Sequence, residues 1–485
     1  MKSRWLSTAL SLGLLVSLLS ACDVNSPMNP GTGGASAAGG ATGGATSGGG
    51  ASVFATGGTF EEADAGPPVA AAITISGAAP KTSSVLYQGI NYWSWVVSYG
   101  AQVVGTEQLV SALKPTLMRV GGTNPDNSTP EAFSNAVIEA AVTYARAVGA
   151  EPLIQVPVLK DASGNVPTAQ TAADIVQYLN VTKSLGVKYF SIGNEPDIYV
   201  DNGHLTSYSA DQLCQTFSVF ADAMKQVDPS IKIVGPDFSW KYQVGGGAND
   251  WLTPFLTNCK SKLDILAVHR YPIDPTLTVE TRAAADPAAF RATLKNLRAA
   301  MDAQGMTSIP LAITEYNITW DGDPTKSILP ASPGTFLAAQ WTADVHGVGL
   351  EEQLWSLDYW SVSEGWTLGM LNGKTPRPAY FALKLYADHF GPRVLATTGT
   401  PTGMSVYSSR NASNDGVQVV AVNWNPQHYD LTVSFQNLSA TAPDTTIRVS
   451  AHSISAFDIS DAGLAKRWVY TQSIAATGGP PVSAP

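Results

Sequence analysis

Eight short apolar runs, each followed by a longer stretch, organise the middle of this sequence. They recur at intervals of roughly 30–46 residues over about 300 residues. The runs are Val85–Asn91, Leu117–Val120, Glu151–Pro157, Lys188–Ile192, Ile231–Val234, Leu263–His269, Ile309–Thr314 and Glu351–Leu357. Most of the stretches between them carry the periodicity of amphipathic helices. Eight strands alternating with helices predict a parallel sheet covered by helices, and eight units favour a (β/α)8 TIM barrel over residues 70–390.

A doubly wound dinucleotide-binding sheet is the alternative fold for this alternation. It would carry Gly-x-Gly-x-x-Gly after an early strand, and the sequence has no such motif there. The net charge is −10, so we expect no nucleic-acid partner, because such partners need a basic surface. His-Glu-x-x-His and Cys-x-x-Cys do not occur either, and we therefore expect no metal site and no cofactor.

The pattern changes after about Arg393, where short alternating segments follow one another without helices between them. These segments are Met404–Ser408, Val417–Asn423, Tyr429–Phe435, Thr446–Val449 and Ser453–Ile459. They predict a small antiparallel β-sandwich over residues 391–474, and the strand-like segment Ala71–Ser76 is a candidate to join it. Residues 475–485 are rich in Ala, Gly and Pro, and we expect this tail to be disordered.

The N-terminal residues 1–22 read as a secretory signal, with Lys2 and Arg4 before an apolar run. The run ends in Leu-Ser-Ala-Cys22, which resembles the bacterial lipobox. That resemblance implies cleavage before Cys22 and attachment of a diacylglycerol to its sulfur; an ordinary signal peptide that ends in Cys is the alternative. Residues 23–69 are rich in Gly, Ala, Ser and Thr and predict a flexible tether. We therefore expect a protein anchored by lipid in a bacterial cell envelope.

Two further cysteines lie within the predicted barrel. Cys214 falls on the fourth predicted helix and Cys259 near the end of the fifth. Adjacent outer helices could bring the two thiols together, and a compartment outside the cytoplasm permits a disulfide. Two buried free thiols are the alternative.

Two glutamates follow strands that lie opposite each other in a barrel of this kind. Glu195 follows the fourth predicted strand and Glu315 the seventh. Active sites of such barrels lie at the carboxyl ends of the strands, so the two carboxyl groups could converge on one bond. Glycoside hydrolysis needs one carboxylic acid to protonate the leaving oxygen and one carboxylate to attack or to activate water. Two carboxylates in ion pairs at the rim are the alternative.

The residues around these glutamates resemble clan A of the glycoside hydrolases. The resemblance rests on Gly193–Pro196 at the end of strand four and on a Glu at the end of strand seven. It implies that Glu195 is the general acid/base and Glu315 the nucleophile, with retention of anomeric configuration. It also implies that Asn194 binds the sugar 2-hydroxyl and that Arg119 keeps the nucleophile ionised.

The same resemblance assigns further residues near the strand ends. Tyr271 matches the clan's aromatic residue beside the nucleophile, and we expect His269 to contact the sugar or the acid/base. Trp355, placed inside the eighth predicted strand, resembles the platform under the reacting sugar. We also expect contacts to the sugar from Asn91, Trp93 and Trp240, whereas we interpret Trp95 and Trp360 as packing residues. Burial and the charge of Glu315 should raise the pKa of Glu195.

Longer stretches resemble particular families of this clan. Asn194–Asp197, Leu263–Pro272 and Ala312–Tyr316 look closest to families 44 and 39, and a barrel with a sandwich also fits families 51, 30 and 79. Family 44 implies endo-acting cleavage of β-1,4-glucan or xyloglucan. We also expect the protein to be a monomer. Val120–Asp126 is nearer to family 79, so an exo-acting enzyme of the arabinofuranosidase, β-xylosidase or β-glucuronidase type stays open. A non-catalytic glycan-binding surface lipoprotein is the alternative from another class.

Overall fold

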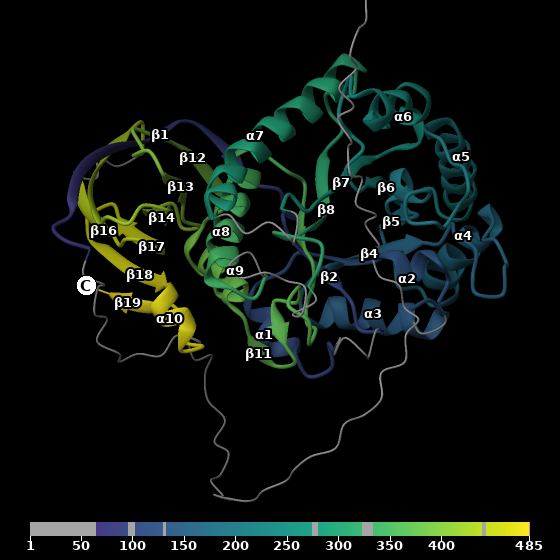
Figure 1. Cartoon of the computed structure of the whole chain (residues 1–485), viewed down its shortest axis with the longest axis horizontal. Coiled ribbons are helices and arrows are strands. Elements are labelled where there is room, and N and C mark those ends of the chain that lie inside the picture. Colours follow the sequence, from purple (N-terminus) through teal and green to yellow (C-terminus); the bar gives the residue numbers. More distant parts are fainter. Residues whose placement is uncertain are drawn as a thin grey trace, which may run out of the picture.

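The computed structural model describes residues 65–95, 102–129, 132–273, 280–322, 333–438 and 443–484. The expected signal peptide, Cys22 and nearly all of the expected tether lie outside these residues. The described chain forms a closed parallel barrel and a nine-stranded sheet beside it, with helices α8 and α9 between them (Figure 1). None of the helices within the described residues combines the length and the hydropathy that crossing a bilayer needs.

The barrel contains eight strands in sequence order, each parallel to both neighbours, which confirms the predicted fold. They are β2 (Gln88–Tyr92), β3 (Leu117–Val120), β4 (Glu151–Val156), β5 (Tyr189–Ile192), β6 (Lys232–Phe238), β7 (Ile265–Arg270), β8 (Leu311–Tyr316) and β9 (Leu357–Tyr359). The first seven match the predicted runs within a few residues. The eighth run was misplaced, because Glu351 still belongs to helix α8 and Gln353 turns the chain with a positive φ of 59° before the strand begins.

Helices follow the strands and cover the outside of the barrel. They are α1 (Glu107–Ala112), α2 (Thr123–Asp126), α3 (Asn135–Ala147), α4 (Ala169–Val176), α5 (Ala210–Val227), α6 (Leu252–Cys259), α7 (Glu280–Ala303), α8 (Phe336–Glu351) and α9 (Pro378–His389). Shorter elements are η2 (Gln177–Thr182), η3 (Pro196–Ile198), η4 (Gly247–Asn249), η5 (Lys260–Lys262) and the β10 (Leu371–Asn372)–β11 (Thr375–Pro376) hairpin. Ser134, Thr168, Ser209 and Thr335 cap four of the helices by accepting a backbone N–H with their hydroxyl groups.

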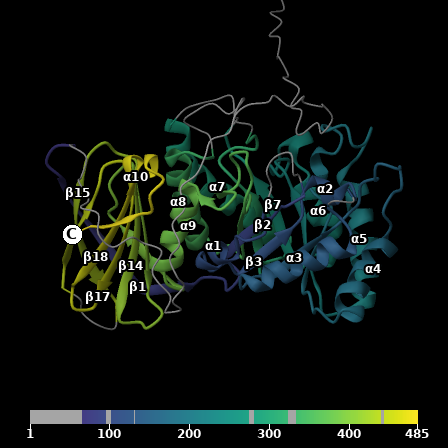
Figure 2. The same ribbon diagram turned by 90° about the horizontal axis from the view of Figure 1, so that it is seen from below.

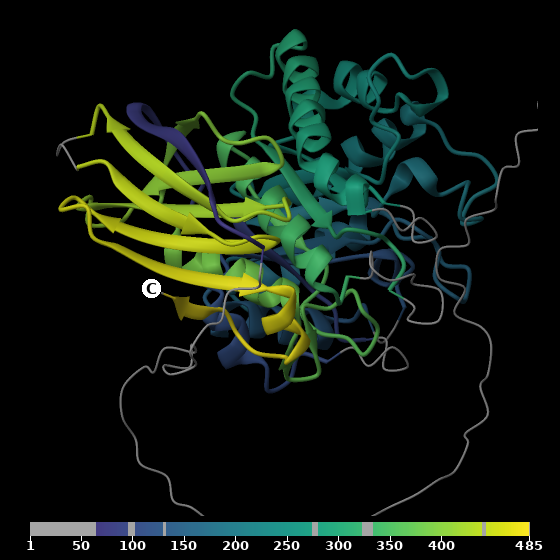
Figure 3. The same cartoon turned by 60° about the vertical axis from the view of Figure 1, so that its left-hand side comes forward.

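The second body is a curved sheet in the strand order β16-β15-β1-β12-β13-β14-β17-β18-β19. Its strands are β1 (Val69–Thr82), β12 (Arg393–Thr398), β13 (Met404–Arg410), β14 (Gly416–Asn423), β15 (Tyr429–Gln436), β16 (Thr445–Val449), β17 (Ser453–Ser460), β18 (Ala465–Thr471) and β19 (Val482–Ala484). The strand-like segment before the barrel does join this sheet, as β1 (Figure 3). It runs antiparallel to β12 but parallel to β15, so the sheet is not purely antiparallel as predicted. One face of the sheet encloses an apolar core of its own.

The C-terminal tail is ordered, which corrects the prediction of disorder from residue 475 onwards. Gln472–Ala476 forms helix α10, and β19 pairs with β18 through Val482 and Val469. Ile474 packs against the main core. The Ala-, Gly- and Pro-rich composition gives no local signal for β19. This strand is stabilised by its backbone hydrogen bonds to β18, which composition does not show.

The two bodies share a packed interface at helix α8, which is buried along almost its whole length (Figure 2). Asp344 of α8 accepts hydrogen bonds from the Tyr407 hydroxyl and from Nε1 of Trp424, the latter at 2.8 Å. Gly347 lies so close to the ring of Tyr407 that a Cβ atom would come within 2.2 Å of it. The helix between β8 and β9 is therefore fixed against the nine-stranded sheet.

Cys214 of α5 and Cys259 at the end of α6 form a disulfide, with a Cα–Cα distance of 5.6 Å. The structure thus decides between the two alternatives that the sequence left open. The bond ties two neighbouring helices of the barrel together.

Candidate active site

Two bulges, in the strands β6 and β8 on either side of β7, shape the mouth of the barrel. Along β6, Pro236 pairs with Ala267 and Phe238 with Val268, so Asp237 is an extra residue without a partner. Along β8, Thr314 is the extra residue, since Ile313 and Glu315 pair with consecutive residues of β7. An extra residue changes the direction in which the side chains after it point. The bulge in β8 therefore lets two consecutive residues, Thr314 and Glu315, both reach the interior of the barrel.

Glu315 lies among hydrogen-bond donors, and 7% of its side chain is exposed. Nη1 of Arg119 donates to Oε1 at 2.6 Å, and the Tyr271 hydroxyl donates to Oε2 at 2.8 Å. Such donors stabilise an ionised carboxylate that still has a free lone pair. Glu315 is therefore placed to act as a nucleophile.

Glu195 directly follows β5 and has a left-handed backbone, with a φ of 52°. Its backbone N–H donates to the carbonyl of Asp237 at 3.0 Å, and its Oε1 lies 3.0 Å from Nδ1 of His269. Burial raises the pKa of Glu195 to about 7. A carboxyl group that keeps its proton near neutral pH is suited to act as a general acid.

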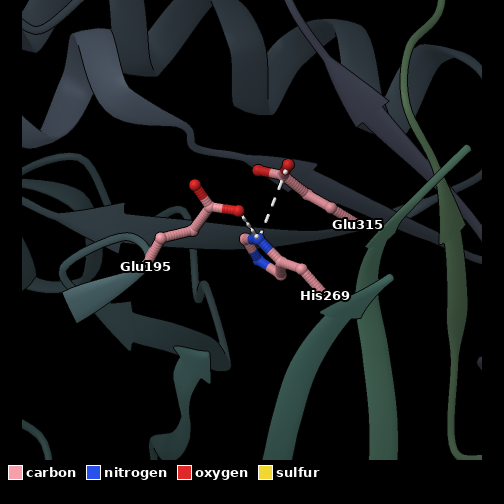
Figure 4. A group of neighbouring side chains, drawn as sticks. All are labelled: Glu195, His269 and Glu315. Carbon is pink, nitrogen blue, oxygen red and sulfur yellow. Dashed lines mark hydrogen bonds and ion pairs between the residues drawn. The ribbon is translucent and has the colours of Figure 1, made fainter. Parts of the chain in front are cut away.

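His269 lies beside both glutamates (Figure 4). Its Nδ1 is 3.0 Å from Oε1 of Glu195 and 3.6 Å from Oε2 of Glu315. Burial lowers the pKa of His269, so the ring is neutral, and we place its one proton on Nδ1 because that atom faces two carboxyl groups. The ligand atoms of the three residues lie within 4.8 Å of one another. Three such residues are enough to bind a metal ion. However, both oxygens of Glu315 already accept hydrogen bonds from Arg119 and Tyr271, and this arrangement fits a pair of catalytic carboxyl groups better.

Arg119 connects the residues below this pair and is completely buried. Besides Glu315, it donates to Oδ1 of Asn194 at 2.8 Å, to Gln155 at 3.1 Å and to Asp237 at 3.2 Å. Burial alone would lower the pKa of Arg119, but the carboxylates of Asp237 and Glu315 outweigh it and raise that pKa. The guanidinium is therefore a fixed positive charge.

Two carboxylates hold the loop that carries Glu195. Asp126 of α2 accepts the backbone N–H of Asn194 at 3.0 Å and the Tyr199 hydroxyl at 2.6 Å. On the other side, Asp197 accepts three consecutive backbone N–H groups of residues 239–241, at 2.8–3.0 Å. These contacts hold the Glu195 loop from the side of α2 and from the segment that follows β6. Asp126 was not among the candidates, because no local signal marks a residue that acts through a distant backbone.

Asn91 does not reach the surface of the site. It is fully buried, and its Nδ2 donates to the carbonyls of Thr314 at 3.0 Å and Asp358 at 3.2 Å, while Oδ1 accepts from Arg119. Asn91 thus links β2 to β3, β8 and β9 by hydrogen bonds, and the expected contact with a sugar was wrong.

Trp355 lies at the opposite end of the barrel from the two glutamates, so its assignment as a sugar platform was wrong. It precedes β9, and its ring meets the ring of Tyr189, the first residue of β5, edge-on at 5.0 Å. Both pack against the apolar layer of Leu117, Leu153 and Ala312. The error follows from the misplaced eighth strand.

Trp360 takes the place at the mouth that we had given to Trp355. It directly follows β9, and its ring centroid lies 5.8 Å from that of Trp93. A Cβ atom on Gly122 would come within 3.0 Å of this indole. Trp93 is largely buried beneath it, whereas Trp240, beyond the acid/base loop, is 44% exposed. We interpreted Trp360 as a packing residue because the sequence pattern misplaced the eighth strand. Only the observed end of β9 at Tyr359 shows that Trp360 is the tryptophan that directly follows it.

The family comparison agrees with this site. Residues 143–328, which include both glutamates, match the model of the glycosyl hydrolase catalytic core. A comparison with curated protein sequences finds no significant match. The match identifies the protein as an enzyme of the glycoside hydrolase class. This finding sets aside the non-catalytic glycan-binding alternative.

Solved structures of families 44 and 51 share the architecture. A family 44 xyloglucanase from Paenibacillus polymyxa is similar with a TM-score of 0.62 and 14% identity, covering 80% of this chain and 98% of that one. The family 44 endoglucanase from Clostridium thermocellum gives 0.60 and 14%, covering 80% and 99%. An α-L-arabinofuranosidase from Thermotoga maritima gives 0.62 and 14%, covering 83% and 96%. At these identities the likeness concerns the fold.

Proposed function

We propose that this enzyme cleaves β-glycosidic bonds with retention, by double displacement, with Glu315 as nucleophile and Glu195 as acid/base. The observation that carries the proposal is the approach of the two carboxyl groups, whose nearest oxygens lie within 4.8 Å. Retaining enzymes hold the two groups about 5–5.5 Å apart, whereas inverting enzymes leave about 6.5–9.5 Å for a water molecule. The short separation therefore favours direct attack by a carboxylate.

Each step of this reaction has a residue suited to it. Glu315, oriented by Arg119 and Tyr271, attacks the anomeric carbon while Glu195 protonates the leaving oxygen. Glu195, now a carboxylate, then takes a proton from water, which hydrolyses the glycosyl–enzyme ester. His269 can donate Nδ1–H to Glu195 in its ionised state, which stabilises the charge that appears between the two steps.

The proposed substrate is a β-1,4-glucan or xyloglucan, cut within the chain. The likeness to family 44 structures supports this choice. Trp240 supports it as well, because an exposed indole beyond Glu195 offers a face on which further sugar rings on the leaving-group side can stack. The second candidate is an exo-acting arabinofuranosidase, since the α-L-arabinofuranosidase from Thermotoga maritima has the same TM-score of 0.62 as the family 44 xyloglucanase.

The test is hydrolysis by the purified full chain of β-glucan, xyloglucan, xylan, arabinan and aryl glycosides, beside Glu195→Gln and Glu315→Gln. We expect oligosaccharides from xyloglucan or β-glucan, with the β-anomer formed first in ¹H NMR. Single arabinose units as the first product would support the second candidate. An α-anomer formed first from a β-linked substrate would contradict double displacement.

We further propose that the enzyme acts as a monomer anchored by lipid at Cys22 in a bacterial cell envelope. The Cys214–Cys259 disulfide supports a place outside the cytoplasm, because structural disulfides persist in oxidising compartments. Labelling of producing cells with radioactive palmitate tests the anchor. We expect label and membrane association in the wild type and neither in Cys22→Ala; an unlabelled, released wild type would support an ordinary signal peptide.

A further inference from the structure

We propose that Asp237 is a positioning residue that couples the acid/base loop to the nucleophile strand, an inference that rests on the proposed function. Asp237 is the extra residue of the bulge in β6 and has a left-handed backbone, with a φ of 57°. Aspartate tolerates this conformation better than most residues. The bulge brings both its carbonyl and its carboxylate to the site.

The backbone of Asp237 acts on the acid/base. Its carbonyl accepts the N–H of Glu195 at 3.0 Å. Glu195 also has a positive φ, so two residues on adjacent strand ends share the unusual conformation and are joined by one hydrogen bond. A shift of Asp237 would therefore move the carboxyl group that protonates the leaving oxygen.

The carboxylate of Asp237 acts on the nucleophile strand. Oδ1 accepts the hydroxyl of Thr314 at 2.6 Å, and Oδ2 lies 3.2 Å from Nη2 of Arg119. Thr314 is the extra residue of the bulge next to Glu315, and Arg119 donates to Glu315 itself. The two bulges are thus joined to each other by one side-chain hydrogen bond, and Asp237 contacts both the residue that precedes Glu315 and the arginine that donates to it.

Asp237 itself is out of reach of a sugar, because it is completely buried beneath these groups. It must therefore act through its neighbours. Loss of its contacts would loosen both glutamates at once, and small displacements of reacting groups are costly: about 1 Å can lower the rate about 100-fold.

Asp237 also acts through its charge. The titratable and charged groups near Glu195 are His269, Glu315, Tyr271, Arg119, Asp237 and Asp197. The side chain of Ser239 also forms a hydrogen bond with Glu195 and lowers its pKa. Burial is the main cause of the raised pKa of Glu195, and the negative charge of Asp237 adds to it. Removal of that charge should therefore lower the pKa of Glu195. Loosened packing that exposes the carboxyl group would lower this pKa too, so the melting temperature of the same variant must stay close to that of the wild type for the shift to report the charge.

The experiment compares Asp237→Asn with Thr314→Val and Thr314→Ser in the full chain. Asp237→Asn keeps the size and tolerates the backbone, but it removes the charge and presents an amide to Arg119. Thr314→Val removes the hydroxyl donor and leaves the charge, and Thr314→Ser keeps the donor. The measurements are kcat and KM, the basic limb of the pH profile of kcat/KM, the melting temperature, and ¹³C NMR titration of Glu195 in glutamate-labelled protein.

For Asp237→Asn we expect a kcat about 100-fold lower, a KM within about threefold of wild type, and a lower pKa of Glu195 both in the profile and by NMR. Thr314→Val should lose about tenfold in kcat with the pKa unchanged, and Thr314→Ser should stay close to wild type. A wild-type kcat in Asp237→Asn, or an unchanged pKa of Glu195, would overturn the proposal.

Two outcomes need separate treatment. If Asp237→Asn does not fold, the two Thr314 variants test the proposal. Equal kcat values for Thr314→Val and Thr314→Ser would show that the hydrogen bond from Thr314 to Asp237 does not affect catalysis, and would overturn the proposal. If the wild type hydrolyses no glycan, the proposed function fails, whereas the NMR titration of Glu195 still tests the influence of Asp237, because it needs no substrate.

Discussion

Nδ1 of His269 lies 3.0 Å from Oε1 of Glu195, and the two side chains come from β7 and from the end of β5, the strands on either side of β6. The contact joins a neutral ring to a carboxyl group whose pKa is raised to about 7 by burial. A neutral donor stabilises the carboxylate without holding it permanently ionised. This pairing lets Glu195 change its protonation state between the two steps of a double displacement.

The raised pKa of Glu195 predicts the pH dependence of the enzyme. Glu195 must carry its proton to assist departure of the leaving group, so kcat/KM should fall as the pH rises through about 7. The measurement is a pH profile on a substrate with a poor leaving group. Glu195→Gln should lack this basic limb. A wild-type limb that lies several units higher would contradict the assignment of the acid.

The two glutamates should respond differently to substitution. Glu195→Ala should lose about 10²–10⁴-fold in rate on a polysaccharide, but much less on an aryl glycoside whose leaving group needs no proton. Azide should restore turnover to Glu195→Ala and give a β-glycosyl azide, because it can attack the intermediate without a general base. Glu315→Ala should lose turnover on both substrates. Rescue of Glu315→Ala to the same β-product would reverse the two roles.

The two tryptophans near β9 form a matched pair. Trp360→Ala should weaken binding or turnover of the glycan, because the ring lies at the mouth beside Trp93. Trp355, which is partly buried like Trp360, packs against the apolar layer at the far end of the barrel, so Trp355→Ala should lower the stability by up to about 3 kcal/mol with KM unchanged. Kinetics and thermal unfolding of both variants test this. A raised KM in Trp355→Ala alone would contradict the placement.

The Cys214–Cys259 disulfide should contribute to stability and not to catalysis. It closes a loop with a sequence separation of 45 residues, and cross-links of this size typically stabilise a protein by about 2–4 kcal/mol. Cys214→Ser with Cys259→Ser should therefore lower the urea midpoint while kcat stays unchanged. Reduction of the wild type should reproduce the shift, and the double variant should not respond to reductant.

The sequence by itself determined the barrel, its first seven strands and the position of both catalytic candidates. These properties are local: a strand shows in a few consecutive apolar residues, and Glu195 and Glu315 stand directly after such runs. Arg119, Asn194, His269 and Tyr271 were found in the same way, each at or after a strand end.

Only the tertiary structure decided which groups surround these residues. The bulges at Asp237 and Thr314 depend on the register between neighbouring strands, which a single sequence does not contain. Trp360, and not Trp355, lies at the mouth because β9 begins only after the turn at Gln353. The ordered tail likewise exists because β18 is there to pair with it. The bulges, the extent of β9 and the ordered tail all depend on pairing with other strands, and local patterns do not reveal such pairing.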